Sequence, residues 1–160
     1  MIIIIMGVAG SGKTTIGSLL ASELGWSFYD ADDFHSESNR AKMSQGVSLT
    51  DEDRASWLLS LKDLIIQNIQ QNTQAVLASS ALKNSYRNIL KVDERVKFIY
   101  LQGSYQQIKT RLINRAGHFM SAAMLDSQFQ ILEEPQNIMT IDISNTPQDI
   151  LAIIRKGLGL

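Results

Sequence analysis

The sequence predicts an α/β fold in which a parallel β-sheet is covered on both faces by helices. Three observations lead to this prediction: short apolar runs alternate with longer segments of helical periodicity, the first run is apolar at every position, and a glycine-rich turn joins that run to a helix. A strand that is apolar on both sides is typical of the middle of a parallel sheet. Connections of helical length between such strands must pack back onto the sheet, which places helices on its faces.

Five short segments are expected to form the strands. Most of their residues are apolar, and each segment is followed within two residues by a small or polar residue at which the chain can leave the sheet. The five segments are residues 2–6, 27–30, 75–78, 96–101 and 138–143.

Four segments, three between the strands and one after the last strand, repeat apolar residues at the three- and four-residue spacing of a helix. They are residues 14–24, 50–69, 104–114 and 147–154. Gly25 ends the first of them, Thr50 caps the second ahead of a carboxylate-rich first turn, and Pro147 begins the last. Gly46 can end a further short helix. The segment 115–134 fits this alternation least well, and we expect it to be a mobile, partly helical excursion from the sheet.

One domain is expected to take up residues 1–160, a typical length for a single domain with its own core. Hydrophobic residues make up 44% of the chain and charged residues 19%, which argues against a disordered chain. No repeat, low-complexity tract or linker is visible. The two prolines, Pro135 and Pro147, both lie near the end of the sequence.

The composition disfavours several classes of partner and site. Fifteen Lys and Arg residues against sixteen Asp and Glu give a formal charge of −1, so we expect neither a nucleic-acid nor a membrane partner. The absence of cysteine excludes disulfides, thiolate metal sites and a cysteine nucleophile, and it fits a reducing compartment. The apolar opening run is too short for a signal peptide or a membrane span. A cytoplasmic protein that acts on small ligands is therefore expected.

The turn after the first strand carries a complete phosphate-binding motif. Residues 7–14 (GVAGSGKT) match the pattern G-x-x-x-x-G-K-[ST], and they lie between a strand and a helix, as the motif requires. Gly7, Gly10 and Gly12 let the backbone turn its N–H groups inward around an anion. Lys13 is expected to bridge the β- and γ-phosphates of a nucleotide, and the Thr14 hydroxyl to bind Mg²⁺. Switches, motors and kinases all use this motif, so it does not name a reaction.

Three carboxylates, Asp30, Asp32 and Asp33, follow the second strand. Ligands of open α/β sheets bind at the carboxyl ends of the strands, and phosphoryl transfer to an alcohol needs a carboxylate that orients the acceptor and takes its proton. Asp32 is the first choice for this role. Neighbouring side chains of an extended segment point to opposite faces, so Asp32 and Asp33 are expected to differ in role. For any one of the three, a solvent-exposed helix cap is an equally good interpretation.

Basic residues follow at several places where an anion could bind. Arg54 lies in the first turn of a helix, where the helix dipole disfavours a cation unless an anion is close by. Lys83 follows a strand end. Arg111 and Arg115 share one helical face and could close over a nucleotide, although two surface arginines are the alternative. His118 alone is weak ground for acid/base or metal chemistry, and no metal-binding histidine is assigned.

Several short blocks occur along nearly the whole chain. They are residues 7–14, 30–35 (DADDFH), 39–43 (NRAKM), 51–58 (DEDRASWL), 80–83 (SALK), 86–87 (YR), 117–120 (GHFM), 127–128 (SQ) and 132–135 (LEEP). In this order and spacing the chain resembles the gluconokinases, which are small P-loop kinases. The resemblance implies ATP:D-gluconate 6-phosphotransferase activity with Mg²⁺. It also implies a nucleoside-kinase-like P-loop NTPase fold of three αβα layers, strand order 2-3-1-4-5, a lid near residues 115–127, and a homodimer.

The resemblance also implies roles for individual residues. The candidates for binding ATP are Gly7, Gly10, Ser11, Gly12, Lys13, Thr14, Thr15, Arg111 and Arg115. The candidates for binding the acceptor are Asp32, Asp33, Arg54, Lys83, Arg87 and His118. Lys13, Asp32 and Arg115 are the expected catalytic residues, and Thr14 and Asp32 the expected Mg²⁺ ligands. The chain departs from the family pattern at Ala9, Ser36 and Ser79, where the family often has Ser, Pro and Cys; none of these changes removes a charge.

Two alternatives remain open at this point. One is a kinase for another small hydroxy acid such as shikimate, or for a nucleoside monophosphate. The other is a nucleotide-dependent switch with no acceptor, although the carboxylate cluster and the paired arginines are features that a switch does not need.

Overall fold

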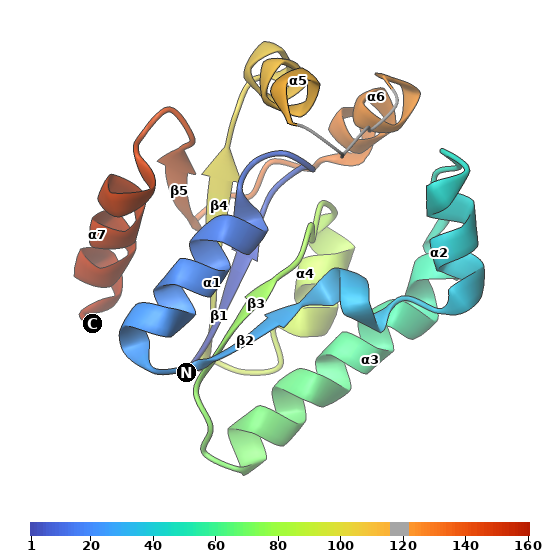
Figure 1. Cartoon of the computed structure of the whole chain (residues 1–160). Coiled ribbons are helices and arrows are strands. Elements are labelled where there is room, and N and C mark those ends of the chain that lie inside the picture. Colours follow the sequence, from blue (N-terminus) through green and yellow to red (C-terminus); the bar gives the residue numbers. More distant parts are fainter. Residues whose placement is uncertain (116–121) are drawn as a thin grey trace.

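Five parallel strands form one sheet in the order β2-β3-β1-β4-β5 in the computed structural model, which describes residues 1–115 and 122–160 (Figure 1). The strands are β1 (Ile2–Met6), β2 (Ser27–Asp30), β3 (Ala75–Ala78), β4 (Val96–Gln102) and β5 (Met139–Asp142). The central strand β1 pairs with β3 on one side and with β4 on the other. All five expected strands are therefore confirmed, and so is the strand order that the resemblance implies.

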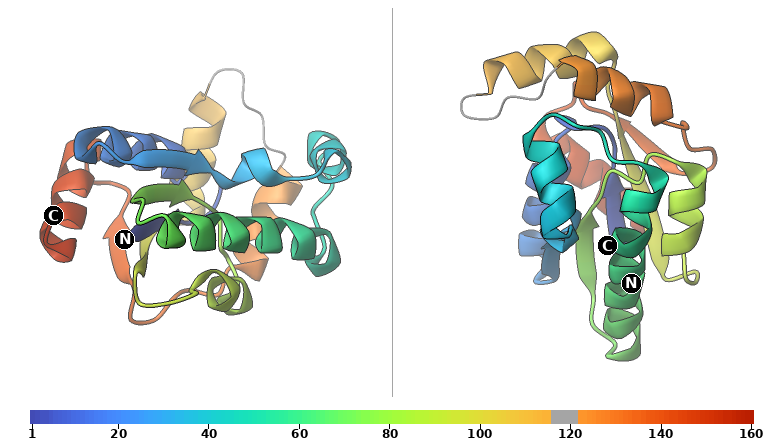
Figure 2. Two further views of the ribbon diagram at one scale, coloured as in Figure 1. Left: turned by 90° about the horizontal axis from the view of Figure 1, so that it is seen from below. Right: turned by 90° about the vertical axis from the view of Figure 1, so that its right-hand side faces the viewer.

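Helices cover both faces of this sheet (Figure 2). They are α1 (Lys13–Leu24), α2 (Glu37–Ser44), α3 (Asp51–Gln70), α4 (Asn84–Leu90), α5 (Tyr105–Asn114), α6 (Ala122–Ile131) and α7 (Pro147–Leu158), with a short 3₁₀ turn η1 (Ala31–Phe34) after β2. Ile3 and Ile5 of β1 pack in a core with α1, α5 and α7, whereas Ile2 and Ile4 pack in a second core with α3 and α4. Because both faces of β1 are buried, every position of this strand is apolar.

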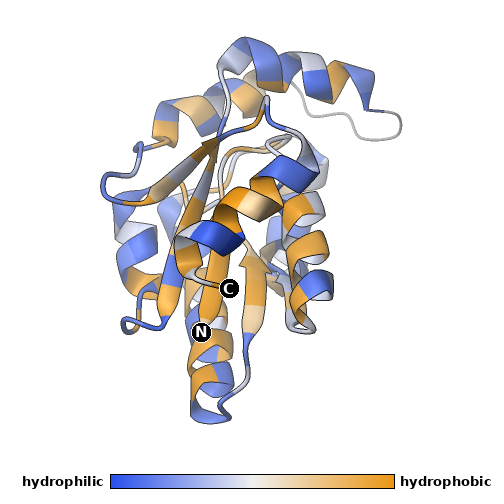
Figure 3. Ribbon diagram, turned by 90° about the vertical axis from the view of Figure 1, so that its left-hand side faces the viewer, coloured by the Kyte–Doolittle hydropathy of each residue, from blue (hydrophilic) through white to orange (hydrophobic). Residues whose placement is uncertain are grey.

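The helix ends follow the local signals in the sequence. Gly25 ends α1 in a left-handed conformation with φ 67°. Thr50 caps α3 in a capping box with Asp53, and Pro147 stands at the first position of α7. In Figure 3 the central strands are mostly hydrophobic, whereas the helices around them mix hydrophobic and hydrophilic residues. Within the described part of the chain, no helix has the length and apolar character needed to cross a membrane.

The carboxyl edge of the sheet is covered by α5 and α6 (Figure 1). The helix α6 shows that the segment 115–134 is partly helical, as expected. Leu125 of α6 is buried, and Phe129 packs edge-on against Tyr105 of α5 with 5.4 Å between ring centroids. Residues 116–121, which include His118, lie outside the described residues. The lid near residues 115–127 and the mobility of this segment stay predictions.

Candidate active site

The loop between β1 and α1 forms a backbone cradle. Gly12, directly before α1, has φ 97°, a left-handed conformation that favours glycine. A Cβ atom at Gly7 would lie only 2.7 Å from Ser11 Oγ and 2.8 Å from the carbonyl oxygen of Leu101, so no larger residue fits there without movement. Gly12 has no side chain with which to cap α1. The N–H groups of the first turn of α1 are thus left for an anionic ligand.

A cleft of about 660 Å³ opens at this loop, a size that suits a small-molecule site. The expected site residues that line it are Gly10, Gly12, Lys13, Thr14, Thr15, Asp32, Arg54, Arg111 and Arg115. Gly7 and Ser11 are buried in the loop itself. The structure does not bring Asp33, Lys83 and Arg87 to the wall of this cleft.

Lys13 is held inside the loop. Its Nζ donates a hydrogen bond to the carbonyl oxygen of Val8 at 2.9 Å. Burial lowers the pKa of the Lys13 amine from 10.5 to about 8, although the charges of Asp32 and Asp30 oppose this shift. A buried, poorly solvated cation gains more free energy from binding an anion than a solvent-exposed cation does. The environment of Lys13 therefore suits phosphate groups.

Thr14 and the end of β2 meet at the same place. Thr14 Oγ1 donates to Asp30 Oδ2 at 2.8 Å, and Asp30 Oδ1 accepts from the backbone N–H of Asp32 at 3.0 Å. Asp30 thus connects β2 to the start of α1, and it is a site residue that the sequence did not single out from its two neighbours. The pKa of Asp32 is raised above 3.8 by local desolvation and then by the charge of Asp30, although 84% of its side chain is exposed.

The donor set at this point fits a hard cation that also binds phosphate. A hydroxyl and two nearby carboxylates, from Thr14, Asp30 and Asp32, are oxygen ligands of the kind that Mg²⁺ prefers. Among the described residues, no group of three or more His, Cys, Asp or Glu side chains forms a metal site by itself. A cation here would need oxygens from a phosphate group or water in addition. In the same loop, the buried Ser11 Oγ has no hydrogen-bond partner among the described residues, so this hydroxyl is available to a phosphate group.

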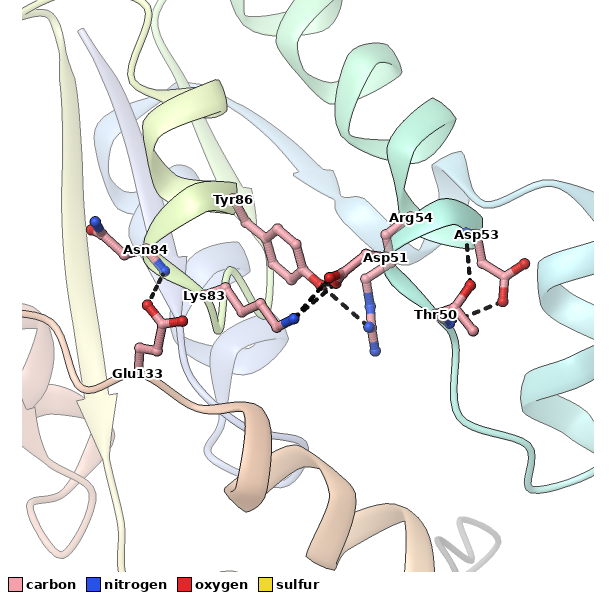
Figure 4. A network of polar contacts seen from close by, with 8 residues as sticks. All are labelled: Thr50, Asp51, Asp53, Arg54, Lys83, Asn84, Tyr86 and Glu133. Atoms are coloured by element: carbon pink, nitrogen blue, oxygen red, sulfur yellow. Dashed lines mark hydrogen bonds and ion pairs between the residues drawn. The ribbon is translucent and has the colours of Figure 1, made fainter.

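Arg54 reaches the cleft from the first turn of α3 and takes part in a polar network (Figure 4). One of its guanidinium nitrogens donates to the hydroxyl of Tyr86 at 3.3 Å. That hydroxyl donates in turn to Asp51 in a short hydrogen bond. Lys83 Nζ binds both oxygens of Asp51, at 2.9 and 3.0 Å. Lys83 therefore does not line the cleft, and its amine is paired with the carboxylate of Asp51.

Arg87 is buried, with 5% of its surface exposed, and its guanidinium binds backbone carbonyls. It donates to Ala81 at 2.9 Å and to Leu82 at 3.0 Å, and it reaches Glu133 on the other side at 2.9 Å. These bonds join the segment after β3 to the segment after α6. In this arrangement Arg87 holds two segments near the cleft together. Asp33 is exposed, and its backbone carbonyl accepts a hydrogen bond from Arg40 at 2.8 Å.

Replacing Arg87 with methionine is expected to destabilise the fold by about 2–4 kcal/mol, because two buried carbonyls and one partly buried carbonyl lose a charged donor. Thermal unfolding of the variant measures this loss. The matched control is Arg95→Met, since the Arg95 side chain is 54% exposed and pairs locally with Asp93. An Arg87→Met protein with the melting temperature of the wild type but a raised KM for the acceptor would instead favour direct contact with the acceptor.

Arg111 of α5 and Arg115, which directly follows this helix, both line the cleft. The helical face that the sequence predicted for the pair does not extend to Arg115, because α5 ends at Asn114 and the backbone of Arg115 is extended with ψ 108°. Arg111 donates to the carbonyl of Ile143 after β5 in a short hydrogen bond. Arg115 contributes positive charge near Lys13 and helps to lower its pKa. Both guanidinium groups can therefore approach a polyanion in the phosphate loop.

Two further residues of the cleft were not among the expected contacts. His35 stacks on Trp57 with 4.5 Å between ring centroids, and burial lowers the pKa of its imidazole from 6.5 to about 4, so this ring is neutral at physiological pH. Gln128 Oε1 accepts from the backbone N–H of Ala9 in the phosphate loop at 2.7 Å. The sequence signal for both was their place in the blocks that carry the resemblance. No spacing rule links Gln128 to a loop 119 residues away.

Comparisons with known proteins identify the family. The family model of shikimate kinase matches residues 9–141. The thermosensitive gluconokinase of Escherichia coli K12 is 47% identical to this chain, over 97% of this chain and 86% of that protein. The chain belongs to the gluconokinase family. This assignment confirms the resemblance, and it places the phosphate loop and the cleft in a family of kinases that use ATP.

Solved structures agree with this family assignment. A gluconokinase from Sinorhizobium meliloti 1021 superposes with a TM-score of 0.84 at 33% identity, covering 98% of this chain and 94% of that one. An unliganded sugar kinase from Janibacter superposes with a TM-score of 0.91 at 38% identity, covering 99% of this chain and 94% of that one.

Proposed function

We propose that this protein transfers the γ-phosphoryl group of ATP to the 6-hydroxyl of D-gluconate. One observation carries the proposal: in a chain of the gluconokinase family, a single cleft joins the phosphate loop to a carboxylate, Asp32, and to a cation, Arg54. These are the parts that an acidic sugar needs in order to meet the terminal phosphate of a nucleotide.

The loop residues hold the nucleotide. Backbone N–H groups of residues 7–14 surround the phosphates, and Lys13 offsets the negative charge that develops on them during transfer. Arg111 of α5 and Arg115, directly after this helix, approach the same phosphates. Thr14 and Asp32, with Asp30 beside them, would hold Mg²⁺, which supplies further charge neutralisation when it is bound.

Asp32 orients the acceptor. Its carboxylate accepts a hydrogen bond from the acceptor hydroxyl and takes its proton as that oxygen bonds to the γ-phosphorus. The bond between this phosphorus and the β–γ bridging oxygen breaks, and ADP leaves. The raised pKa of Asp32 makes it a better proton acceptor than an ordinary aspartate. Asp33 is outside the cleft lining, which favours Asp32 for this role.

Arg54 binds the carboxylate of the acceptor, since an arginine fork matches a carboxylate in two hydrogen bonds. Lys83 and Arg87 stabilise the segments around Arg54 without lining the cleft: Lys83 binds Asp51, and Arg87 binds backbone carbonyls. His118 stays a candidate acceptor contact, and the homodimer also stays a prediction.

Shikimate is the second candidate acceptor, because the shikimate kinase model matches residues 9–141. Measuring ADP release with gluconate, shikimate, AMP or no acceptor tests both. We expect turnover with gluconate to exceed the other three rates by at least about a hundredfold. Only a matched acceptor forms hydrogen bonds with all the polar groups of the site. Turnover confined to shikimate or AMP would overturn the proposal, and hydrolysis that is independent of any acceptor would favour a nucleotide-dependent switch.

A further inference from the structure

Arg54 lies in an acidic helix turn, yet the carboxylates beside it do not neutralise its charge. Its neighbours in the first turn of α3 include Asp51 and Asp53. Each of these carboxylates is paired with a lysine from another element: Asp51 with Lys83 at 2.9 Å, and Asp53 with Lys42 at 2.7 Å. Among the described residues, Arg54 itself forms no ion pair. The nearest carboxylates are thus engaged elsewhere, and Arg54 remains able to bind an anion.

Tyr86 is the group that stands between Arg54 and Asp51 (Figure 4). A phenol has one proton to donate, and the short hydrogen bond to Asp51 uses it. The phenol oxygen can then only accept, and it accepts from Arg54 at 3.3 Å. Arg54 is therefore held by a neutral oxygen. A direct bond to Asp51 would neutralise the charge that an acidic ligand must meet.

The ring of Tyr86 contributes to the same arrangement. Tyr86 is 5% exposed and belongs to the core that packs α3 and α4 against the sheet, so its position is fixed. The Arg54 guanidinium lies 5.8 Å from the ring centroid, and Lys83 Nζ lies 5.7 Å from it. Burial and the hydrogen bond to Asp51 both raise the pKa of Tyr86, which keeps the phenol neutral at physiological pH.

We propose that Tyr86, anchored by the pair of Asp51 and Lys83, is a positioning residue that holds Arg54 in the cleft with its charge available for the carboxylate of the acceptor. The inference rests on the proposed function, because it assigns the acid group of the acceptor to Arg54. It gives the enzyme a means to prefer acidic sugars over neutral ones: a neutral sugar would leave the Arg54 charge in the cleft without a counter-ion.

The test is the steady-state kinetics of Tyr86→Phe with ATP and gluconate. Phenylalanine keeps the buried ring and removes only the hydroxyl, so Arg54 loses the oxygen that holds it in the cleft. We expect the KM for gluconate to rise about tenfold, the usual scale for one hydrogen bond to a charged group, with kcat and the KM for ATP changed less than about twofold. Asp51→Asn, which weakens the anchor of the phenol without altering the core, is expected to change the KM for gluconate in the same direction.

Tyr100→Phe is the matched control. Tyr100 is buried in the same core, but within residues 1–115 and 122–160 the hydrogen bond of its hydroxyl is a long contact of 3.4 Å with Glu134. Its loss is expected to leave the KM for gluconate unchanged. A second comparison places Tyr86→Phe in an Arg54→Ala background, where kcat/KM for gluconate should fall no further, because Tyr86 acts through Arg54.

A wild-type KM for gluconate in both Tyr86→Phe and Asp51→Asn would overturn this inference. So would an equal fall of kcat/KM with and without Arg54, or an equal rise of the KM in Tyr100→Phe. All of these outcomes require a wild-type protein that phosphorylates gluconate. A wild-type protein without that activity would instead overturn the proposed function, and this inference together with it.

Discussion

Replacing Lys13 with methionine is expected to lower phosphoryl transfer by at least about three orders of magnitude while it stabilises the ligand-free protein. The loss of activity follows from the loss of the positive charge that contacts the phosphates during transfer. The gain in stability follows from burial, because the cation is held in a site that lowers its pKa to about 8. Activity and stability therefore change in opposite directions at one residue.

The pH dependence of this stabilisation can be derived from the pKa. Below pH 8 the folded protein carries Lys13 protonated and under-solvated, which costs free energy of folding. Between pH 8 and 10.5 the unfolded chain binds more protons at this amine than the folded protein does, so the stability of the wild type rises with pH. The advantage of Lys13→Met is thus expected to be about 1–3 kcal/mol below pH 8, because part of the side chain still contacts solvent, and to shrink toward pH 10.5.

Thermal unfolding at pH 7 and pH 10 measures the stability difference, and ADP release with gluconate measures the activity. Lys156→Met, an exposed lysine on α7 away from the cleft, is the control, and it should change neither quantity appreciably. Near-normal turnover in Lys13→Met would contradict the assigned role of the loop. A lower melting temperature at pH 7 would contradict the cost of burying this cation.

The sequence was sufficient for the parts of the site that neighbouring residues define. The apolar run of β1, the glycines of the loop and the start of α1 are consecutive, so the conformation of each restricts the next. For the same reason Asp32, which closely follows a strand end, could be placed at the carboxyl edge of the sheet. Arg111 and Arg115 do line the same cleft, but α5 ends at Asn114, so helix geometry is not what brings Arg115 there.

The contacts that spacing could not predict join residues far apart in the chain. Arg87 binds the carbonyl of Glu133, 46 residues away, and this contact determines that the guanidinium supports two segments near the cleft. Tyr86 lies between Arg54 and Lys83 only because α3 and α4 pack side by side on one face of the sheet. Lys83 was predicted to contact the acceptor from its charge and its position after a strand, and the resemblance implied the same role for Arg87. Only the folded structure shows that protein oxygens already bind both side chains.

Replacing Asp32 with asparagine is expected to reduce turnover with gluconate by about two to three orders of magnitude, while the affinity for ATP falls much less, because Thr14 and Asp30 still offer oxygens to Mg²⁺. Asparagine keeps the shape of the side chain and removes its capacity to take a proton. Asp33→Asn is the matched control, because Asp33 is the adjacent carboxylate, is exposed and does not line the cleft. Its turnover should remain close to that of the wild type.

The raised pKa of Asp32 adds a second readout to this experiment. Desolvation and the charge of Asp30 oppose ionisation, so the carboxylate becomes able to accept a proton only at a pH above the ordinary value of 3.8. In the wild type, kcat is expected to fall as the pH drops through this raised pKa, and Asp32→Asn should lose that dependence along with most of its rate. A parallel loss of ATP affinity and turnover would contradict the assignment of Asp32 to the acceptor and would indicate that it acts chiefly on the nucleotide.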